Sequence, residues 1–430
     1  MMKAKVITLG CKVNQYESEA MLSSLLQHGF AAAEDKETAD VVILNSCTVT
    51  AESDRKVRQI FRRAKKDNPD AVMVLTGCMA QAFPEDARRL EEADIILGTS
   101  NRKRLVPDLL AFLSARQRII DIAPHTNDEK FENLNVENFT GRTRAFVKIE
   151  DGCNRFCSYC IIPYARGRVR SKPLEDLKAE LAGLGANGYK EVVLTGINLS
   201  AYGQEFGLHL CDAIEAACAT PGIERVRLGS LEPEQLSEDV IRRMAKQKKL
   251  CPQFHLSLQS GCDATLKRMN RHYTADEYRT IVRNLRAAFE NAAITTDIMV
   301  GFAGETDEEF AESLAFAEEI AFAKVHVFAY SRRPGTRAYD MGDQLTNAVK
   351  EARSHEMIRV TTATQQAFFK AQIGRTEEVL FEREIQKGVW EGYSMNYTPV
   401  AVASGTSLAG EIRAVRIEIC TDTHCMGVVL

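Results

Sequence analysis

The stretch 153–160 reads Cys153-Asn-Arg-Phe-Cys157-Ser-Tyr-Cys160 and places three cysteines in a C-x3-C-x2-C pattern just after the strand-like run Ala145–Ile149. Three thiolates at this spacing fit one cuboidal four-iron four-sulfur cluster. Because such a cluster needs four ligands, one iron stays free to bind a small molecule. A structural zinc site would use a fourth Cys or His, and none stands within about ten residues on either side. The stretch therefore predicts a cluster loop at the start of a βα domain.

The region that begins at Arg144 repeats a strand-then-helix pattern six times. Six such units suit an open, partial barrel, and we expect a partial (βα)6 barrel within residues 142–371 that ends in one long helix, Ala348–Ala371. The predicted strands are Ala145–Ile149, Glu191–Leu194, Arg225–Leu228, Phe254–Leu258, Ala293–Val300 and Lys324–Tyr330.

The first 120 residues alternate β-rich runs with helical stretches such as Glu17–His28 and Asp54–Lys66. This alternation is typical of an α/β domain with a doubly wound parallel sheet. The β-rich runs are Lys5–Leu9, Val41–Leu44, Ala71–Leu75 and Ile95–Leu97.

The polar stretch 121–141 resembles a linker, since it has few aliphatic residues and several turn formers. Residues 372–430 form short alternating runs with Gly-rich turns, which predict a small C-terminal β-barrel. Its predicted strands are Glu377–Phe381, Thr398–Ala403 and Glu411–Ile419.

Three further cysteines, Cys11, Cys47 and Cys78, each follow an apolar strand of the first domain directly. In a parallel sheet these positions share one edge, the crevice where cofactors bind. The alternative is that they are buried small hydrophobes, as free cysteines often are. Their repeated placement favours a second, auxiliary cluster site with three ligands.

Polar and Gly-rich segments also follow the later barrel strands, at the edge where parallel βα folds bind ligands. A glycine after a strand is often only a turn residue, so each segment alone is weak. Together they predict cofactor binding by Gly196, Asn198, Ser230, Glu232, Gln259, Asp297 and Gly301.

The segment 162–172 carries alternate basic residues beside an aromatic residue, and its arginines could bind a phosphate or carboxylate of the substrate. A solvated basic loop is the alternative. The predicted substrate-binding residues are Arg166, Arg168 and Arg170. The remaining cysteines and several histidines are interpreted as ordinary side chains: Cys211, Cys218, Cys251, Cys262, Cys420, Cys425, His209, His255, His272 and His326.

The composition is that of an ordinary soluble protein, and the formal net charge of −4 gives no general attraction to nucleic acid. Any RNA contact must therefore come from local basic patches. No signal peptide or membrane-spanning run is recognisable, so the cysteines are expected to be thiols or metal ligands in the cytoplasm.

The cluster loop resembles that of the radical S-adenosylmethionine superfamily, in which the cofactor chelates the open iron. Tyr159 matches the position that packs against the adenine of the cofactor. Over essentially its whole length the chain is similar to the methylthiotransferases. The matching stretches are TLGCKVNQYESE, ILNSCTVTAESDRKVRQ, LTGCMAQ, DGCNRFCSYCIIPYARGRVRS, LTGIN, LQSGCDATLKRMNR, TDIMVGFAGET, YSRRPGTRA and NYTPV.

This resemblance implies three domains: an N-terminal methylthiotransferase domain (1–120) holding an auxiliary [4Fe-4S] cluster through Cys11, Cys47 and Cys78, a radical domain (142–371) and an RNA-binding TRAM barrel (372–430). The segment 10–15, Gly-Cys-Lys-Val-Asn-Gln, is similar to the branch that acts on N6-threonylcarbamoyladenosine beside the tRNA anticodon. Other branches act on isopentenyladenosine or on a ribosomal protein. The barrel segment, however, carries more acidic than basic residues, which argues against tight RNA binding by this barrel alone.

The implied reaction begins when an electron donor of the flavodoxin or ferredoxin type reduces the cluster on Cys153, Cys157 and Cys160. S-adenosylmethionine is then cleaved to methionine and a 5′-deoxyadenosyl radical. Such chemistry suits adenine C2, whose C–H bond no side-chain base can deprotonate. The second cluster supplies the sulfur, and another S-adenosylmethionine methylates it. The rival interpretation from another class is an iron–sulfur RNA-binding sensor without turnover.

Overall fold

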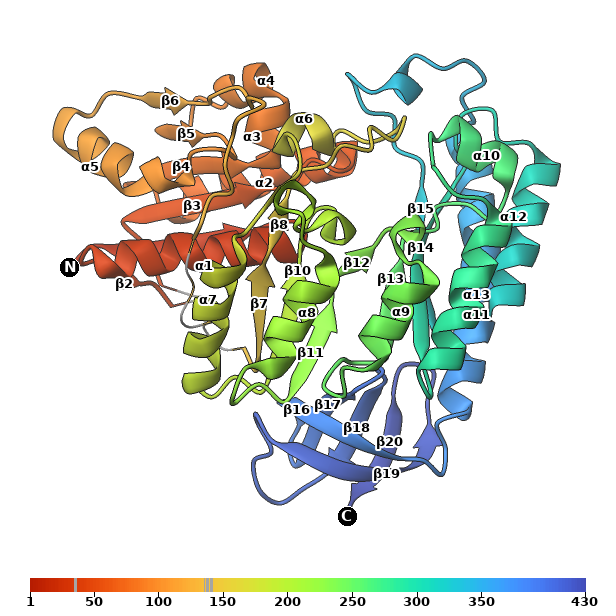
Figure 1. The fold of residues 1–430 in the computed structure, drawn as a ribbon. Helices are drawn as coiled ribbons and strands as arrows, with labels where there is room; N and C mark the ends of the chain where they lie inside the picture. The colour runs from red at the N-terminus through yellow and green to blue at the C-terminus, as the bar shows by residue number, and fades with distance from the viewer. Residues whose placement is uncertain (35–36, 135, 137–138, 140–141) are drawn as a thin grey trace.

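The computed structural model of the chain describes residues 1–34, 37–134, 136, 139 and 142–430. Its N-terminal part is a parallel sheet of six strands in the order β2-β1-β3-β4-β5-β6 (Figure 1). The strands are β1 (Lys3–Thr8), β2 (Ala31–Ala32), β3 (Val41–Ser46), β4 (Val72–Gly77), β5 (Ile95–Leu97) and β6 (Ile119–Asp121).

Both faces of this sheet are covered, because β3 and β4 are buried along their whole length. One face packs on α1 (Lys12–Gln27) and α5 (Leu105–Ala115), and the other on α2 (Ala51–Asp67), α3 (Cys78–Ala82) and α4 (Pro84–Arg88). The predicted doubly wound α/β fold is confirmed.

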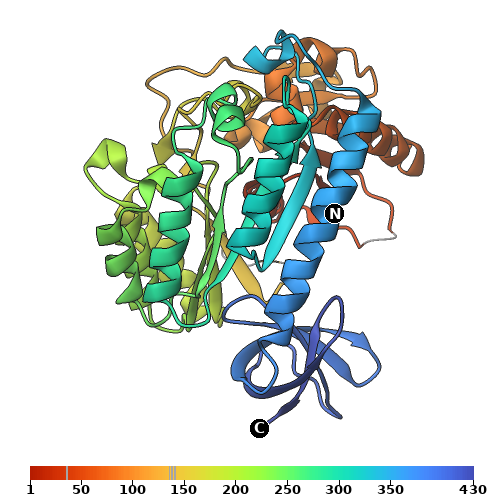
Figure 2. The same cartoon turned by 90° about the vertical axis from the view of Figure 1, so that its right-hand side faces the viewer.

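The central part contains all six predicted strands of the βα barrel, as two parallel sheets, β11-β10-β7 and β12-β13-β14-β15. These six are β7 (Arg144–Lys148), β10 (Glu191–Thr195), β11 (Arg225–Leu228), β13 (Gln253–Leu256), β14 (Ala293–Val300) and β15 (Lys324–Ala329), and the sheets also contain the short strand β12 (Ser230–Leu231), which was not predicted. Helices α7 (Leu174–Ala186), α8 (Leu210–Ala219), α9 (Glu238–Ala245), α11 (Ala275–Ala288), α12 (Asp307–Ile320) and α13 (Asn347–Lys370) lie outside them (Figures 1 and 2).

The cluster loop lies between two short antiparallel strands, β8 (Glu150–Asp151) and β9 (Arg170–Ser171), together with α6 (Ile162–Arg166). Figure 1 shows α6 above the carboxyl ends of β7 and β10, close to α3 of the N-terminal sheet. The two cysteine-bearing regions therefore face one another.

The long helix α13 leads from the barrel to the C-terminal domain (Figure 2). That domain is a closed five-stranded barrel, as predicted, of β16 (Thr376–Gln386), β17 (Val389–Ser394), β18 (Pro399–Ala403), β19 (Ile412–Cys420) and β20 (Cys425–Val429). The sequence prediction missed β17 and β20. In the described part of the chain, no helix is long and apolar enough to cross a membrane.

The C-terminal barrel docks against the amino ends of the central strands. Arg225 donates to the carbonyls of Tyr393 and Glu378, and Arg227 donates to those of Ser394 and Met395. Both arginines are buried. The C-terminal barrel therefore closes the end of the central barrel opposite the cluster loop (Figure 1).

The structure contradicts one expectation about the cysteines of this barrel. Cys420 and Cys425 were expected to be ordinary thiols, but they form a disulfide. Cys420 and Cys425 are paired across β19 and β20 at the turn that joins these strands, so the strand register brings the two side chains together.

Candidate active site between two cysteine triplets

The structure brings Cys11, Cys47 and Cys78 together at one edge of the N-terminal sheet. They follow β1, β3 and β4, which are adjacent in the sheet, so the three loops are neighbours. A side chain at Gly10 would lie 3.0 Å from Cβ of Cys47, which shows how closely the first two loops approach. Burial, with the neighbouring thiols of Cys47 and Cys11 adding to it, raises the pKa of Cys78 to about 12. Burial and the thiol of Cys11 also raise the pKa of Cys47.

The second triplet is held by main-chain hydrogen bonds within its loop. The N–H of Cys153 donates to the carbonyl of Gly167, and the N–H of Cys160 to that of Cys157. Burial, and then the neighbouring thiol of Cys157, raise the pKa of Cys160. Tyr159 stands beside them, half-buried, with its ring 6.3 Å from that of Phe302.

Each triplet offers three cysteine thiols as its donor set. No group of three or more His, Cys, Asp or Glu side chains among the described residues is placed to hold one ion. A cuboidal cluster takes one thiolate on each of three irons, so its ligands stand farther apart than those of a single ion. Three neighbouring thiols without a fourth ligand suit a cluster with one open iron.

Two of the three predicted substrate-binding residues, Arg166 and Arg170, are buried in the structure. The Nε of Arg166 donates to Sγ of Cys78 at 3.2 Å, and its Nη2 donates to Oδ1 of Asn14 at 2.9 Å. Arg170 donates to the carbonyls of Arg166 and Arg168. Only Arg168 is exposed. Arg166 thus connects α6 of the cluster loop to the auxiliary triplet.

Arg166 belongs to a buried charge network that joins the two domains. Glu17 on α1 contacts Arg166, Lys148 at 2.8 Å and Arg102 at 3.0 Å. Burial alone would raise the pKa of Glu17, but these cations lower it to about 2, so the carboxylate is charged. Lys148 also contacts Asp151, next to the cluster loop.

Arg333, on the loop after β15, is a second arginine that links the central barrel to the N-terminal domain. Its Nη2 donates to Thr48 Oγ1 at 2.8 Å and to Asp54 Oδ2 at 2.7 Å, just after Cys47. The sequence analysis missed this role, although Arg333 lies in the family-like stretch YSRRPGTRA.

Two of the predicted cofactor-binding residues, Gly196 and Asn198, lie against Glu150 of β8, just before the cluster loop. Its Oε2 accepts a hydrogen bond from the N–H of Asn198 at 2.6 Å, and a side chain at Gly196 would collide with the same oxygen. The Oδ1 of Asn198 is buried and has no partner among the described residues. An unpartnered acceptor in this position can receive a hydrogen bond from a ligand.

The other predicted cofactor-binding residues lie at the neighbouring strand ends. Gln259 has a positive φ of 69° and pairs through its main chain with β14 at Asp297 and Met299. Gly301 directly follows the same strand, and its N–H donates to Oε2 of Glu305. Ser230 is exposed.

Glu232 forms an ion pair with Arg271, whose Nη1 lies 3.3 Å from Sγ of Cys157. The sequence analysis missed Arg271, which ends the stretch LQSGCDATLKRMNR.

Polar side chains also line the interior of the central barrel below the two triplets. His255 contacts Thr295 Oγ1 at 3.1 Å and Asp297 Oδ2 at 3.4 Å, and its ring lies 6.1 Å from that of His326. These two histidines, interpreted as ordinary side chains, thus share one wall with Asp297. Burial and the charges of Arg227 and Arg144 lower the pKa of Lys12, the residue after Cys11, to about 8.

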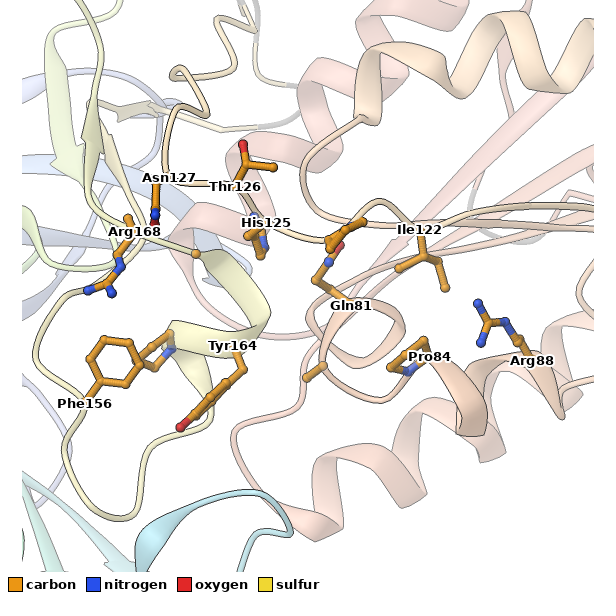
Figure 3. A pocket seen from close by; sticks show the side chains of 14 residues that line it. Gln81, Pro84, Arg88, Ile122, His125, Thr126, Asn127, Phe156, Tyr164 and Arg168 are labelled. Carbon is orange, nitrogen blue, oxygen red and sulfur yellow. The ribbon is translucent and has the colours of Figure 1, made fainter.

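A pocket of about 500 Å³ lies between α6 and the N-terminal domain. Figure 3 shows Phe156, Tyr164 and Arg168 on the side of the cluster loop and Gln81, Pro84 and Arg88 across from them. Tyr164 is 52% exposed, and the guanidinium of Arg168 lies 5.2 Å from the centre of the Phe156 ring.

Comparisons with known proteins agree with this architecture. The family model of the radical SAM superfamily matches residues 147–317, and that of Uncharacterized protein family UPF0004 matches residues 3–98. A solved radical S-adenosylmethionine methyltransferase, TsrM from Kitasatospora setae, is similar in fold with a TM-score of 0.57 and 15% identity, over 79% of this chain and 74% of that one. The fold and the cluster loop define a radical S-adenosylmethionine enzyme, whose chemistry uses a [4Fe-4S] cluster and S-adenosylmethionine.

Curated relatives specify the family further. The threonylcarbamoyladenosine tRNA methylthiotransferase MtaB of Bacillus subtilis is 36% identical over 95% of this chain and 92% of its own length. That of Thermotoga maritima is 37% identical over 98% and 96%. The tRNA-2-methylthio-N(6)-dimethylallyladenosine synthase of Pelotomaculum thermopropionicum is 34% identical over 100% and 98%. The chain belongs to the radical S-adenosylmethionine methylthiotransferase family.

Proposed function

We propose that this methylthiotransferase acts on tRNA and converts N6-threonylcarbamoyladenosine beside the anticodon into its 2-methylthio derivative. The observation that carries the proposal is that Arg166, on the helix after the cluster loop, contacts Cys78 of the other cysteine triplet. The chain also aligns over 95% and 98% of its length with two enzymes named for this substrate. Mass spectrometry of tRNA nucleosides from cells lacking the protein tests it. The 2-methylthio nucleoside should be absent and its threonylcarbamoyl precursor should accumulate.

In this proposal Cys153, Cys157 and Cys160 hold the cluster that binds S-adenosylmethionine, and Cys11, Cys47 and Cys78 hold a second [4Fe-4S] cluster. When bound, these groups supply a 5′-deoxyadenosyl radical and the sulfur that is transferred. Tyr159, Gly196, Asn198, Ser230, Glu232, Gln259, Asp297 and Gly301 surround the cofactor. The protein positions both groups around one base, and Arg166 fixes their relative placement.

Two clusters per chain give a direct prediction of iron content. Anaerobically reconstituted protein should contain about eight irons, as expected for two four-iron clusters. The triple variant Cys153→Ala, Cys157→Ala and Cys160→Ala should keep about half of them. Iron analysis with Mössbauer spectroscopy measures both quantities. A triple variant with undiminished iron would contradict the assignment of two sites.

We also propose that the pocket beside α6 receives part of the anticodon loop. Bases of single-stranded loops can be unstacked and placed on aromatic or guanidinium planes, and Tyr164 and Arg168 offer both at this surface. Of the three predicted substrate-binding arginines, Arg168 is the one exposed at this surface. The acidic balance of the C-terminal barrel leaves little phosphate binding to that domain.

Salt titrations of tRNA affinity distinguish the contributions of Arg168 and Tyr164. Arg168→Ala should weaken tRNA binding and reduce the slope of log Kd against log salt by about one. Tyr164→Ala should weaken binding by about 1–3 kcal/mol with an unchanged slope, because stacking releases no counterions. Arg242→Ala, on the exposed face of α9, is the matched control. Equal slopes for Arg168→Ala and the control would contradict this contact.

Reduction by a flavodoxin- or ferredoxin-type donor and a cytoplasmic location complete the proposal. The nearest alternatives are the same chemistry on isopentenyladenosine tRNA, which the Pelotomaculum relative's name favours, or on a ribosomal protein. Parallel assays with the three substrates decide between them. Formation of 5′-deoxyadenosine under reducing anaerobic conditions excludes a sensor without turnover.

A further inference from the structure

The outer side of α2 is strongly basic in a chain whose formal net charge is −4. Seven of the seventeen residues of this helix are Lys or Arg, and three are acidic. One side of the helix is buried against the N-terminal sheet through Val57, Phe61 and Ala64. The opposite side is exposed, as expected of an amphipathic helix. We call it the basic face of α2, and it consists of Arg55, Lys56, Arg62, Arg63 and Lys66.

The positive charge of the basic face is not cancelled within the protein. Three of its five cations contact an acidic side chain, but these three are 64–83% exposed. Exposed ion pairs contribute little free energy, so another anion can replace the acidic partner. Lys56 and Lys66 form no ion pair within the described part of the chain. Asp54, one of the three acidic residues of α2, is turned inward and pairs with Arg333.

The helix α2 begins beside the auxiliary triplet and leads away from it. Its N-cap residue, Thr50, follows Cys47 by three residues. On the same face of the N-terminal sheet lie α3 and α4, which line the pocket beside α6 (Figure 1). Arg62 pairs with Glu92, four residues after the end of α4. The basic face therefore lies next to the region that holds this pocket and the auxiliary triplet.

The dimensions and the surroundings of the basic face suit the backbone of a nucleic acid. Arg55 and Lys66 are eleven positions apart, which corresponds to about 16 Å along an α-helix. Each strand of a duplex carries one phosphate for about every 3.4 Å of its axis, so this face can span several consecutive phosphates. The acidic C-terminal barrel, by contrast, lies at the end of the central barrel opposite the cluster loop (Figure 1).

We propose that the basic face of α2 binds backbone phosphates of the anticodon stem while the pocket beside α6 holds part of the loop. This inference rests on the proposed function, in which tRNA is the substrate. Phosphate contacts fix the register and orientation of a nucleic acid but carry no sequence information. The basic face therefore orients the stem, and the site between the triplets selects the base.

An acidic electron-donor protein is the other kind of partner that a basic surface attracts. The position of α2 favours RNA over such a protein. The helix follows Cys47 of the auxiliary triplet, whereas the donor has to reduce the cluster assigned to the other triplet. A donor on this face would approach the wrong cluster.

Salt titrations with two RNAs test the proposal: a complete anticodon stem–loop, and a single-stranded oligonucleotide with the sequence of the loop alone. The triple variant Lys56→Gln, Arg62→Gln and Lys66→Gln removes three charges with little change in helix propensity. For the stem–loop, the slope of log Kd against log salt should fall by about two to three, since each lost phosphate contact lowers it by about one. For the loop oligonucleotide, the slope should equal that of the wild-type protein.

The matched control is the triple variant Lys178→Gln, Arg242→Gln and Arg279→Gln, which removes three exposed charges from the outer helices α7, α9 and α11. It changes the net charge of the chain by the same amount and should leave the slope unchanged. Iron content and circular dichroism report whether each variant is folded. The single variant Lys66→Gln, at the end of α2 farther from Cys47, should lower the slope by about one.

Four results would overturn the proposal, each in a different way. An equal loss of slope in both triple variants would indicate general attraction instead of a contact. An unchanged slope in the α2 variants would exclude this face while leaving the proposed function intact. Equal losses for the stem–loop and the loop oligonucleotide would place the contact in the loop. Slower cluster reduction by a donor protein, with unchanged RNA affinity, would identify a donor site. A wild-type protein that binds neither RNA overturns the proposed function itself.

Discussion

Replacing Cys11 or Cys47 by Ala is expected to abolish methylthio transfer while 5′-deoxyadenosine still forms from S-adenosylmethionine. The reason is that the cofactor is assigned to the separate triplet of the cluster loop, whose main-chain hydrogen bonds do not involve these two residues. Radical formation and sulfur supply would then be independent. Quantification of 5′-deoxyadenosine and of 2-methylthio nucleoside in the same anaerobic reaction measures both.

Two further variants serve as controls for this experiment. Cys153→Ala should abolish both products, and Cys211→Ala, which removes a buried thiol outside either triplet, should retain both. If a folded Cys11→Ala or Cys47→Ala variant lost cofactor cleavage as completely as transfer, the separate roles of the triplets would be wrong.

Arg166→Met is expected to lower the free energy of unfolding by about 3–5 kcal/mol, since it leaves the buried Glu17 with fewer cationic partners. The side chain is fully buried and carries contacts to α1 and to Cys78, so water cannot replace it. Urea unfolding followed by circular dichroism measures the change. Arg168→Met, an exposed position two residues away, should change stability by no more than about 0.5 kcal/mol.

The double variant Glu17→Gln with Arg166→Met gives a sharper test. Because the carboxylate and its partner are removed together, the double variant should lose less stability than the two single variants summed. Strict additivity would show that the pair is not coupled, and the network would then not hold the two domains together through these residues.

Much of the candidate site follows from the sequence alone. In parallel βα folds the residue after a strand lies at the carboxyl edge, so local strand patterns were enough to place Cys11, Cys47 and Cys78 side by side. The six strands of the central barrel were found in the same way, because their apolar runs are short and regularly spaced. The strands β17 and β20 were missed, since their pairing depends on barrel closure rather than on a local pattern.

Only the tertiary structure decided what the charged residues do. Alternate arginines in the segment 162–172 look solvent-exposed in sequence, yet Arg166 is buried because Glu17, 149 residues earlier, supplies its counter-charge. The physical reason is that periodicity and spacing act over a few residues, whereas the desolvation and pairing of charges depend on groups that only folding brings together.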